Sequence, residues 1–233
     1  MKRFISMLKI LNSFLFIIIC SKLMNKPLIS VLITTIIYLT LSDILHTIIH
    51  ELGHLVGGIF SGYKFFSFQF ANFKLRKYQN TGTYSLHFES ELCGQCVMIP
   101  KSTACKKYIL YNIAGIFFNF ALFLIVGIFT IISYNNLPTY ILVFMYAFLI
   151  IGINKLLSNA IPHTNNSKLN DMSIILMLHG SKQTLADYIH YLCFYEKMVC
   201  KLPLPKQYNR QFEVTDHYNP VFYNEITKLL DSD

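Results

Sequence analysis

Long apolar blocks separated by short polar segments dominate the chain. No Asp, Glu, Lys or Arg occurs over residues 28–42 or over residues 108–154. A bilayer span needs about 20 apolar residues, so the second block is long enough for two helices, with "SYNNLPT" (133–139) as their turn. The pattern predicts about four transmembrane helices, over residues 4–23, 28–60, 108–133 and 139–161.

Between the second and third predicted helices the pattern changes to strict alternation. Every second position over residues 66–70 is phenylalanine, and residues 84–88 alternate in the same way after the turn sequence "NTG" (80–82). A period of two on both sides of a turn is typical of a β-hairpin. We therefore expect a mainly α-helical, polytopic membrane protein with a small β-hairpin or sheet between its second and third spans.

The two ends of the chain differ from this membrane core. Residues 1–22 have a basic start and an apolar centre, as a signal peptide has, but no small-residue cleavage site follows, which favours an uncleaved first span. After residue 161 a polar, turn-rich segment leads to a short apolar helix that begins at Asp171. We expect a core over residues 1–180 and a cytoplasmic or interfacial tail over residues 181–233.

Composition supports the membrane assignment and excludes other classes. The chain is 54% hydrophobic and 14% charged, which is unlike a soluble domain. Its net charge of +8 comes from scattered Lys and Arg rather than a basic stripe with stacking aromatics, so nucleic acid is not an expected partner. Seven of these residues lie between positions 61 and 107 and seven after 161, but none in the 133–139 turn. The positive-inside rule then predicts a multi-pass protein of the cell membrane with both termini cytoplasmic.

The sequence H-E-x-x-H near the end of the second predicted span is the strongest chemical signal. His50 and His54 are one helical turn apart and project from the same face, so both imidazoles can bind one ion. Zinc accepts imidazole ligands, and a catalytic zinc site needs three protein ligands and an open position for water. Glu51 stands beside the first ligand, where it can take a proton from that water.

Two polar residues upstream share nearly the same helix face. His46 and Asp43 cannot join both histidines on one ion, because the outer Cα atoms of three turns are about 12 Å apart. His46 is therefore expected to support a ligand or line a polar cavity, and Asp43 to orient a neighbour or face water. Haem ligation remains an alternative, with one of these histidines paired to a distant one such as His179, as in a membrane electron carrier.

The segment "IIHELGHLVGGIFSGYKFFSFQF" (48–70) resembles the second-span pattern of the site-2 protease family of intramembrane zinc metalloproteases. In "AGIFFNF", Ala114, Gly115 and Asn119 fit that family's A-G-x-x-x-N on the next span. "CGQCVMIP" (93–100) takes the position of its glycine-rich loop. The resemblance covers about residues 42–178, and this chain has no evident PDZ-like insertion.

The resemblance also implies a third zinc ligand. The family carries it as an Asp in a segment N-x-x-P followed by D-G, and "NAIPHTNNSKLNDM" (159–172) offers Asn159, Pro162 and Asp171. The Pro-to-Asp spacing is longer than in the family, and Met172 replaces the glycine. The implied ligand set is His50, His54 and Asp171, with His163 and Asp43 as alternatives to Asp171.

What the resemblance implies is a zinc-dependent endopeptidase that cleaves a membrane-embedded peptide or transmembrane segment, in regulated intramembrane proteolysis or peptide-precursor maturation. Glu51 is the implied catalytic base, and Asn119, Phe68 and Asn159 are expected to support substrate or transition state. The strand of residues 66–70 is the expected docking edge for an unwound substrate. The expected partners are a membrane-inserted peptide or protein, the lipid bilayer and a regulatory membrane protein.

Two further interpretations accompany the protease hypothesis. The lengthened segment before Asp171 also fits a zinc-binding membrane regulator without catalytic activity, although such a protein has no need of a base at Glu51. Cys93 and Cys96 form C-x-x-C, a spacing found in redox and zinc sites. Because no second pair accompanies them, a structural loop is the favoured interpretation.

Overall fold

A computed structural model describes residues 2–24, 27–78, 81–102, 107–162, 164–165 and 168–180, together with residues 182, 184–186, 188–189 and 192–193. The elements follow one another in the predicted order, helices first and last with strands between. They are α1 (Lys2–Met24), α2 (Leu28–Phe60), β1 (Tyr63–Lys77), β2 (Tyr84–Pro100), α3 (Tyr108–Ser133), α4 (Thr139–Ala160), β3 (Thr164–Asn165), β4 (Lys168–Leu169) and α5 (Asp171–Gly180).

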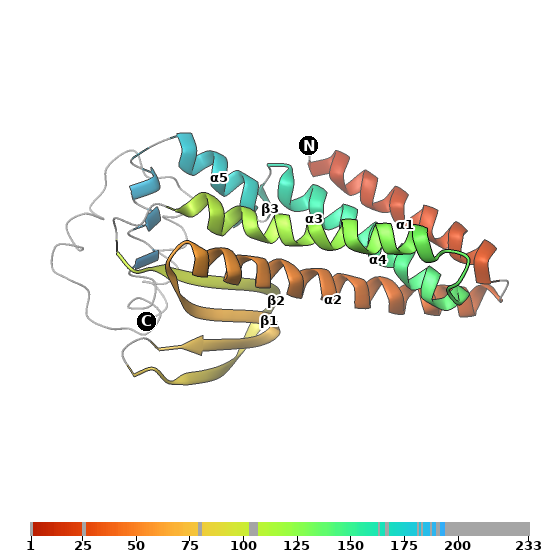
Figure 1. Cartoon of the computed structure of the whole chain (residues 1–233), viewed down its shortest axis with the longest axis horizontal. Coiled ribbons are helices and arrows are strands. Elements are labelled where there is room, and N and C mark those ends of the chain that lie inside the picture. The colour runs from red at the N-terminus through yellow and green to blue at the C-terminus, as the bar shows by residue number, and fades with distance from the viewer. Residues whose placement is uncertain are drawn as a thin grey trace.

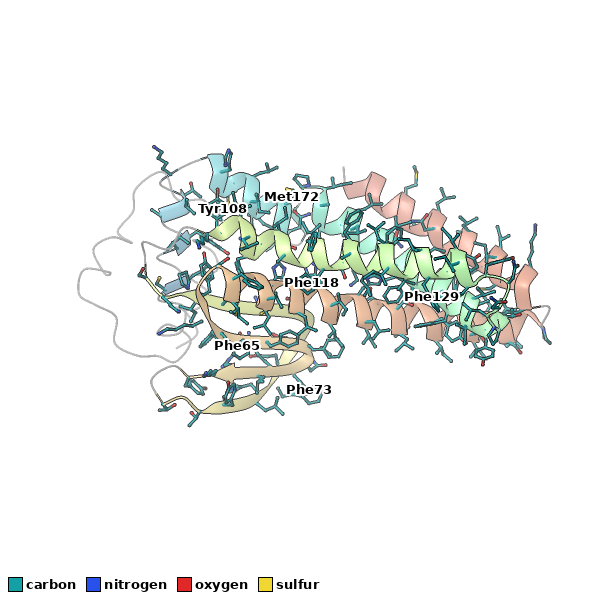
Figure 2. All side chains as sticks on the ribbon, viewed as in Figure 1. Phe65, Phe73, Tyr108, Phe118, Phe129 and Met172 are labelled. Carbon is teal, nitrogen blue, oxygen red and sulfur yellow. The ribbon has the colours of Figure 1, made fainter. Side chains whose placement is uncertain are left out.

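The long helices lie side by side, and the β1–β2 sheet and α5 are gathered at one end of this bundle (Figure 1). Within the described part of the chain, three helices, α2, α3 and α4, are long and apolar enough to cross a membrane. Their outward positions carry large apolar side chains, and carbon-rich sticks cover the bundle along its length (Figure 2). Ile131 of α3, for example, is 79% exposed. Such a surface is typical of contact with lipid, and the fold is consistent with a membrane protein.

The length of α2 fixes the depth of the H-E-x-x-H motif. This helix has 33 residues, which corresponds to about 50 Å at a rise of 1.5 Å per residue. The hydrocarbon core of a bilayer is only about 30 Å thick. His50 follows Leu28 by 22 residues, or about 33 Å along the axis. The motif is therefore about one bilayer thickness from the start of α2, at the end of the bundle where the sheet lies.

A small antiparallel sheet is present, and its strands β1 and β2 are longer than the alternating segments alone. β1 and β2 form a two-stranded antiparallel sheet in which Tyr63 pairs with Pro100 and Lys77 with Tyr84. Two register shifts interrupt β1, and at the second Ala71 adopts a positive φ of 52°. Such bulges bend a strand and increase its twist. The bent sheet can therefore pack its inner half on α2 while its outer half projects away (Figure 1).

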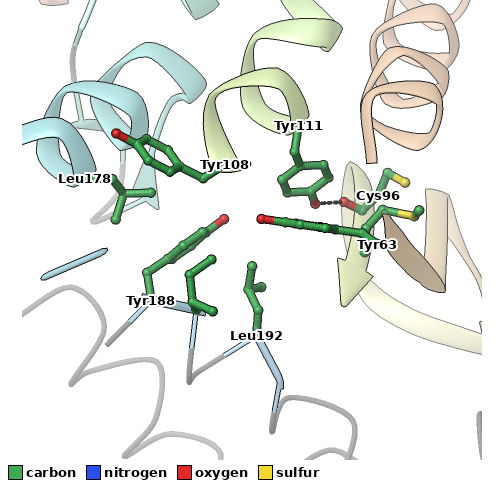
Figure 3. Packing of buried hydrophobic residues seen from close by; sticks show 9 residues of the cluster. Tyr63, Cys96, Tyr108, Tyr111, Leu178, Tyr188 and Leu192 are labelled. Carbon is green, nitrogen blue, oxygen red and sulfur yellow. Dashed lines mark hydrogen bonds between the residues drawn. The ribbon is translucent and has the colours of Figure 1, made fainter. Parts of the chain in front are cut away.

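A tyrosine-rich cluster joins the sheet to the helices. Tyr63 of β1, Tyr111 of α3 and Leu178 of α5 are buried in it, and the Tyr111 hydroxyl donates a 2.7 Å hydrogen bond to the Cys96 carbonyl (Figure 3). Tyr188 and Leu192, from the expected tail, are buried in the same cluster. The described tail residues thus pack against the core, while residues 194–233 lie outside the described part of the chain.

The backbones of α2 and α3 approach each other closely through small residues. A side-chain carbon added at Gly53 would lie 2.6 Å from the Ala114 carbonyl oxygen, and one at Gly57 would lie 2.8 Å from the Leu110 carbonyl oxygen. Gly53 and Gly57 form a G-x-x-x-G spacing, which lets membrane helices pack backbone to backbone. The "ELGHLVGG" sequence therefore encodes helix packing as well as a metal motif.

We expect Gly53→Ala to destabilise the protein by about 1–3 kcal/mol, because the methyl group meets backbone atoms that cannot move aside easily. The measurement is thermal unfolding of the detergent-purified chain. Gly127→Ala in α3 is the matched control, since its new carbon would lie 3.7 Å from Leu149 Cδ2, an ordinary contact. Equal melting temperatures for both variants and wild type would contradict the close-packing interpretation.

Candidate metal centre

α2 brings the two motif histidines together as the spacing predicts. The Nε2 atoms of His50 and His54 are 3.1 Å apart, and the rings meet edge to face with centroids 4.7 Å apart. Both residues are more than nine-tenths buried. Because α3 covers this face of α2, the two imidazoles have room only where α3 has a small residue. That residue is Gly115, where an added carbon would lie 2.6 Å from His54 Nε2.

Asp171 completes a group of three metal-binding side chains. Its carboxylate oxygens lie 3.0 Å from His50 Nε2 and 3.5 Å from His54 Nε2. One ligand atom from each residue fits within 4.8 Å of the other two. Metal–ligand bonds of about 2.0–2.1 Å in a tetrahedron place ligand atoms about 3.4 Å apart. The 3.1 Å between the two Nε2 atoms is close to this spacing, and the Asp171 carboxylate presents one oxygen to each imidazole.

The segment before α5 shows how a lengthened loop still delivers Asp171. β3 and β4 form a two-residue antiparallel pair, Thr164 with Leu169 and Asn165 with Lys168, which takes up the extra length. Asn170 then holds both ends of the connection. Its amide nitrogen donates to the backbone carbonyls of Ser158 and Ile161 at 2.7 and 2.6 Å, and its side-chain oxygen caps α5 by accepting from the Ser173 N–H.

The charge state of Asp171 suits a metal ligand. Burial alone would raise the pKa of this carboxyl group, but attraction to His54 and His50 outweighs burial and holds the pKa below its usual range. The carboxylate is therefore ionised at neutral pH. Its Oδ2 atom is buried and makes no hydrogen bond within the described part of the chain, although it lies 3.0 Å from His50 Nε2. A cation between these atoms would satisfy them, so the residues present fit a metal ion.

His50 and His54 each contact a residue of α3 through Nδ1, the ring nitrogen that does not face Asp171. His54 Nδ1 lies 2.9 Å from the Tyr111 carbonyl oxygen, which can only accept a hydrogen bond. When His54 binds a metal ion as a neutral imidazole, its proton would therefore be on Nδ1, and the lone pair of Nε2 would be directed at the ion. His50 Nδ1 lies 3.4 Å from the side-chain amide of Asn119, which in turn contacts His46.

Glu51 lies beside the ligands and against β2. The Cys96 backbone N–H hydrogen-bonds to the Glu51 carboxylate. Burial, followed by the nearby Glu51, raises the pKa of the Cys96 thiol, which is therefore a neutral group and not a nucleophile or metal-binding thiolate. The side chain of Cys93 lies outside the described residues, so the C-x-x-C interpretation rests on Cys96 alone.

A cavity of about 370 Å³ opens next to the two motif residues His50 and Glu51. α2 and α4 form most of its wall, and Gly94 of β2 closes one side. Most of the lining side chains are polar: Asp43, Thr47, His50, Glu51, Asn154, Lys155, Ser158 and Asn159. A polar cavity of this size between membrane helices has room for water and for a short stretch of peptide.

Asp43 forms an ion pair with a lysine of α4. Lys155 Nζ lies 2.9 Å from the Asp43 carboxylate and donates a 2.9 Å hydrogen bond to the Thr47 hydroxyl. Opposite charges and a hydroxyl thus stabilise one another within the apolar bundle, on the cavity wall. Asp43 is not part of the ligand group. His163, the other alternative ligand, lies outside the described residues.

The remaining predicted site residues occupy three different places. Asn159 lines the cavity. Asn119 is fully buried and contacts His50 and His46 instead of lining the cavity. Phe68 pairs with Cys96 across the sheet and packs on the tyrosine-rich cluster, away from the cavity wall. His179 is exposed near the end of α5 and is not in the ligand group.

Sequence reasoning missed six residues that line the cavity, namely Thr47, Gly94, Ile151, Asn154, Lys155 and Ser158. Lys155 had a usable signal, because it ends a long charge-free run inside a predicted span. Gly94 was visible only as part of "CGQC". An added carbon there would lie 2.5 Å from Thr47 Cγ2 and 3.0 Å from Glu51 Oε1, so only glycine allows β2 to approach Glu51 this closely.

Comparison with known proteins does not assign this chain to a family. A scan against models of protein families, a search of curated proteins and a search of solved structures each found no match for this chain.

The ligand group predicts the metal content of variants. Detergent-purified wild type should carry about one zinc ion per chain, and Asp171→Ala should lose most of it because two imidazoles alone bind weakly. Glu51→Gln should keep the metal, since Glu51 is not in the ligand group. The measurement is elemental mass spectrometry, with an absorption spectrum of the same samples to detect haem.

Asp43→Asn is the matched control for this experiment. It removes an acidic side chain of the same type from the cavity wall, and its metal content should equal that of wild type. Full zinc occupancy in Asp171→Ala, or loss of zinc in Asp43→Asn, would contradict the ligand assignment.

Proposed function

We propose that this chain is a zinc-dependent intramembrane endopeptidase of the site-2 protease type, acting on a membrane-inserted peptide or transmembrane segment. One observation carries the proposal: the buried Glu51 carboxylate lies next to the His50–His54–Asp171 group on the wall of a polar cavity inside an apolar helix bundle. A ligand group, an acid–base residue and a space for water are the components of metal-assisted peptide hydrolysis.

The residues have distinct roles in this reaction. Zinc held by His50, His54 and Asp171 would polarise the scissile carbonyl and lower the pKa of a water molecule. Glu51 accepts the proton of that water and later gives it to the departing nitrogen. The Cys96 N–H fixes the Glu51 carboxylate on the β2 side of the cavity. Asn159, Thr47 and Lys155 keep the cavity polar enough to admit water.

A transmembrane helix satisfies its own backbone hydrogen bonds, so the segment to be cut must first unwind. The edge of β2 that faces away from β1 supports a docking mode for the unwound chain. Cys96 directs its N–H toward Glu51 and its carbonyl toward Tyr111, both away from β1. Residues two apart on a strand share an edge, so Gly94 presents its backbone on that same edge, beside the cavity. An extended substrate can add to the sheet there.

This docking edge differs from the one that the alternating pattern indicated. Residues 66–70 belong to β1, and the cavity borders β2. We therefore propose that β1 supports β2 from behind, with Phe68 anchored in the tyrosine-rich cluster. Substrate contacts then fall on Gly94 and on Asn159 at the opposite wall of the cavity.

The membrane arrangement of the proposed enzyme has four spans. α1 (Lys2–Met24) is the fourth, and it packs against α2 and α4 through Phe16, Cys20 and Val31. The distribution of Lys and Arg places the motif end of α2 and both termini on the cytoplasmic side. A membrane-anchored regulator or a peptide precursor is the proposed class of substrate, and a regulatory membrane protein is a proposed partner.

The two alternatives receive less support from the geometry. Haem iron takes axial ligands from opposite faces of a flat macrocycle, whereas the atoms of His50, His54 and Asp171 converge on one point. A zinc regulator without activity would not require Glu51, which is 7% exposed and would be costly to bury without a function.

The first functional prediction concerns Glu51. Zinc-loaded wild type in lipid vesicles should cleave members of a panel of single-span peptides, and Glu51→Gln should be slower by about 10²–10⁴-fold while it keeps zinc. Chelation should abolish cleavage and added zinc should restore it. Products are identified by mass spectrometry. Equal rates for Glu51→Gln and wild type, or cleavage of no peptide by the zinc-loaded wild type, would contradict the proposal.

The second prediction concerns the β2 edge. Gly94→Pro should reduce cleavage more strongly than Gly94→Ala, because both variants add a carbon near Glu51 but only proline lacks the backbone N–H that pairs with substrate. Zinc content should be unchanged in both. Phe68→Pro tests the other strand and should have a smaller effect on cleavage than Gly94→Pro. The docking mode is wrong if the Pro and Ala variants at position 94 have the same turnover.

A further inference from the structure

A chain of polar groups connects the metal centre to the middle of the bundle. Asn119 of α3 is fully buried, with its side-chain nitrogen 3.4 Å from His50 Nδ1 and its side-chain oxygen 3.2 Å from His46 Nδ1. His46 is also fully buried, and its Nε2 lies 3.0 Å from the Phe148 carbonyl oxygen on α4. The chain His50–Asn119–His46–Phe148 therefore crosses three helices within apolar surroundings.

At the α4 end of this series of polar groups, the surrounding residues leave space for the His46 ring. A carbon added at Gly152 would lie 3.0 Å from His46 Cε1 and 3.1 Å from its Nε2, so glycine gives the ring its space on α4. The Phe148 ring lies against His46 with centroids 4.1 Å apart. The His46 ring is thus held on one face by packing and at one nitrogen by a backbone carbonyl.

Counting protons along the chain fixes the state of every member. The Phe148 carbonyl can only accept, so the proton of His46 is on Nε2. A neutral His46 then has a lone pair at Nδ1 and needs a donor, which is the NH₂ group of Asn119. The Asn119 amide meets this need when it is turned by 180°, which exchanges the positions of its nitrogen and oxygen, and the oxygen then accepts from His50 Nδ1–H. This places the His50 proton on Nδ1 and leaves the lone pair of Nε2 directed at Asp171.

The orientation without this turn, with the Asn119 oxygen toward His46 and the nitrogen toward His50, has two penalties. The amide oxygen would face His46, and because the Phe148 carbonyl also accepts, His46 would have to carry two protons as a fully buried imidazolium. The Asn119 NH₂ group would then donate to His50 Nδ1, so the His50 proton would move to Nε2, the atom that faces the ligand group. Oxygen and nitrogen of an asparagine amide have the same shape, so hydrogen bonding decides between the orientations.

We propose that His46 is a positioning residue that sets the tautomer of His50 through Asn119, and so prepares His50 Nε2 to bind the metal. The proposal rests on the metal centre of the proposed function and not on proteolysis itself. Different hydrogen bonds then fix the tautomers of the two histidine ligands. His54 donates directly to the Tyr111 carbonyl, whereas His50 depends on a relay that begins at the Phe148 carbonyl.

The test is the zinc affinity of the purified full chain, measured in detergent by competition with a fluorescent chelator. His46→Phe keeps an aromatic ring against Phe148 but removes both nitrogens, and it should weaken zinc binding by about 10- to 100-fold. His46→Gln is the matched variant, because its amide can donate to the Phe148 carbonyl and accept from Asn119. It should bind zinc within about threefold of wild type, a small difference beside the loss typical of a removed supporting group.

A double-mutant cycle separates the relay from simple packing. Asn119→Leu should weaken zinc binding as His46→Phe does, and the double variant should be no weaker than either single variant. Visible absorption of the cobalt-loaded proteins reports whether the ligand geometry changes together with affinity. Thermal unfolding of the zinc-free variants monitors the fold separately.

Three results would overturn the proposal: wild-type affinity in His46→Phe, equal losses in His46→Phe and His46→Gln, or additive losses in the double variant. If His46→Phe does not fold, His46→Gln still decides, since a large loss of affinity in a folded Gln variant contradicts the relay. A wild type that binds zinc but cleaves no peptide contradicts the proposed function and leaves the relay intact. A wild type that binds no metal overturns both.

Discussion

Direct contact between the backbones of α2 and α3 is the constraint on which the rest of this structure depends. Gly53 and Gly57 allow α2 to lie against Ala114 and Gly115 of α3, with the methyl group of Ala114 packed against Gly57. Only at this separation can the Tyr111 carbonyl reach His54 and the Asn119 amide reach His50. The glycines and the histidines of one short segment therefore act together, because the packing of the helices sets the orientation of the ligands.

Much of the fold could be predicted because its strongest signals are local. Charge-free runs and their turn located the helices to within a residue or two at most ends, and a period of two located the sheet. The strands are longer than the alternating segments because pairing across the sheet supports residues that the pattern did not mark. Arg76 and Glu89 form a 2.7 Å ion pair there, and pairing with β1 resumes after each of the two register shifts and carries β2 onward to Pro100.

The site was predictable only where one helix carries it. His50, Glu51 and His54 are fixed by helical spacing, whereas Asp171 was expected from family resemblance and needed the β3–β4 turn and the Asn170 cap to reach them. The sequences of the β3–β4 turn and of the Asn170 cap do not indicate how far Asp171 lies from α2. The same holds for Asn119 and Lys155, whose partners are far away in the chain. The alternating pattern also could not say which strand faces the cavity, since bulges and packing decide it.

The distance along the chain between the ligands has a consequence for stability. Asp171 follows His54 by 117 residues, and the loop between them contains the sheet, α3 and α4. An ion bound to both would act as a cross-link that closes this loop, and cross-links over long loops restrict the unfolded chain most. The metal ion would then join α5 to the helix bundle. Removal of the ion would first loosen α5, a short helix whose first turn is capped by Asn170.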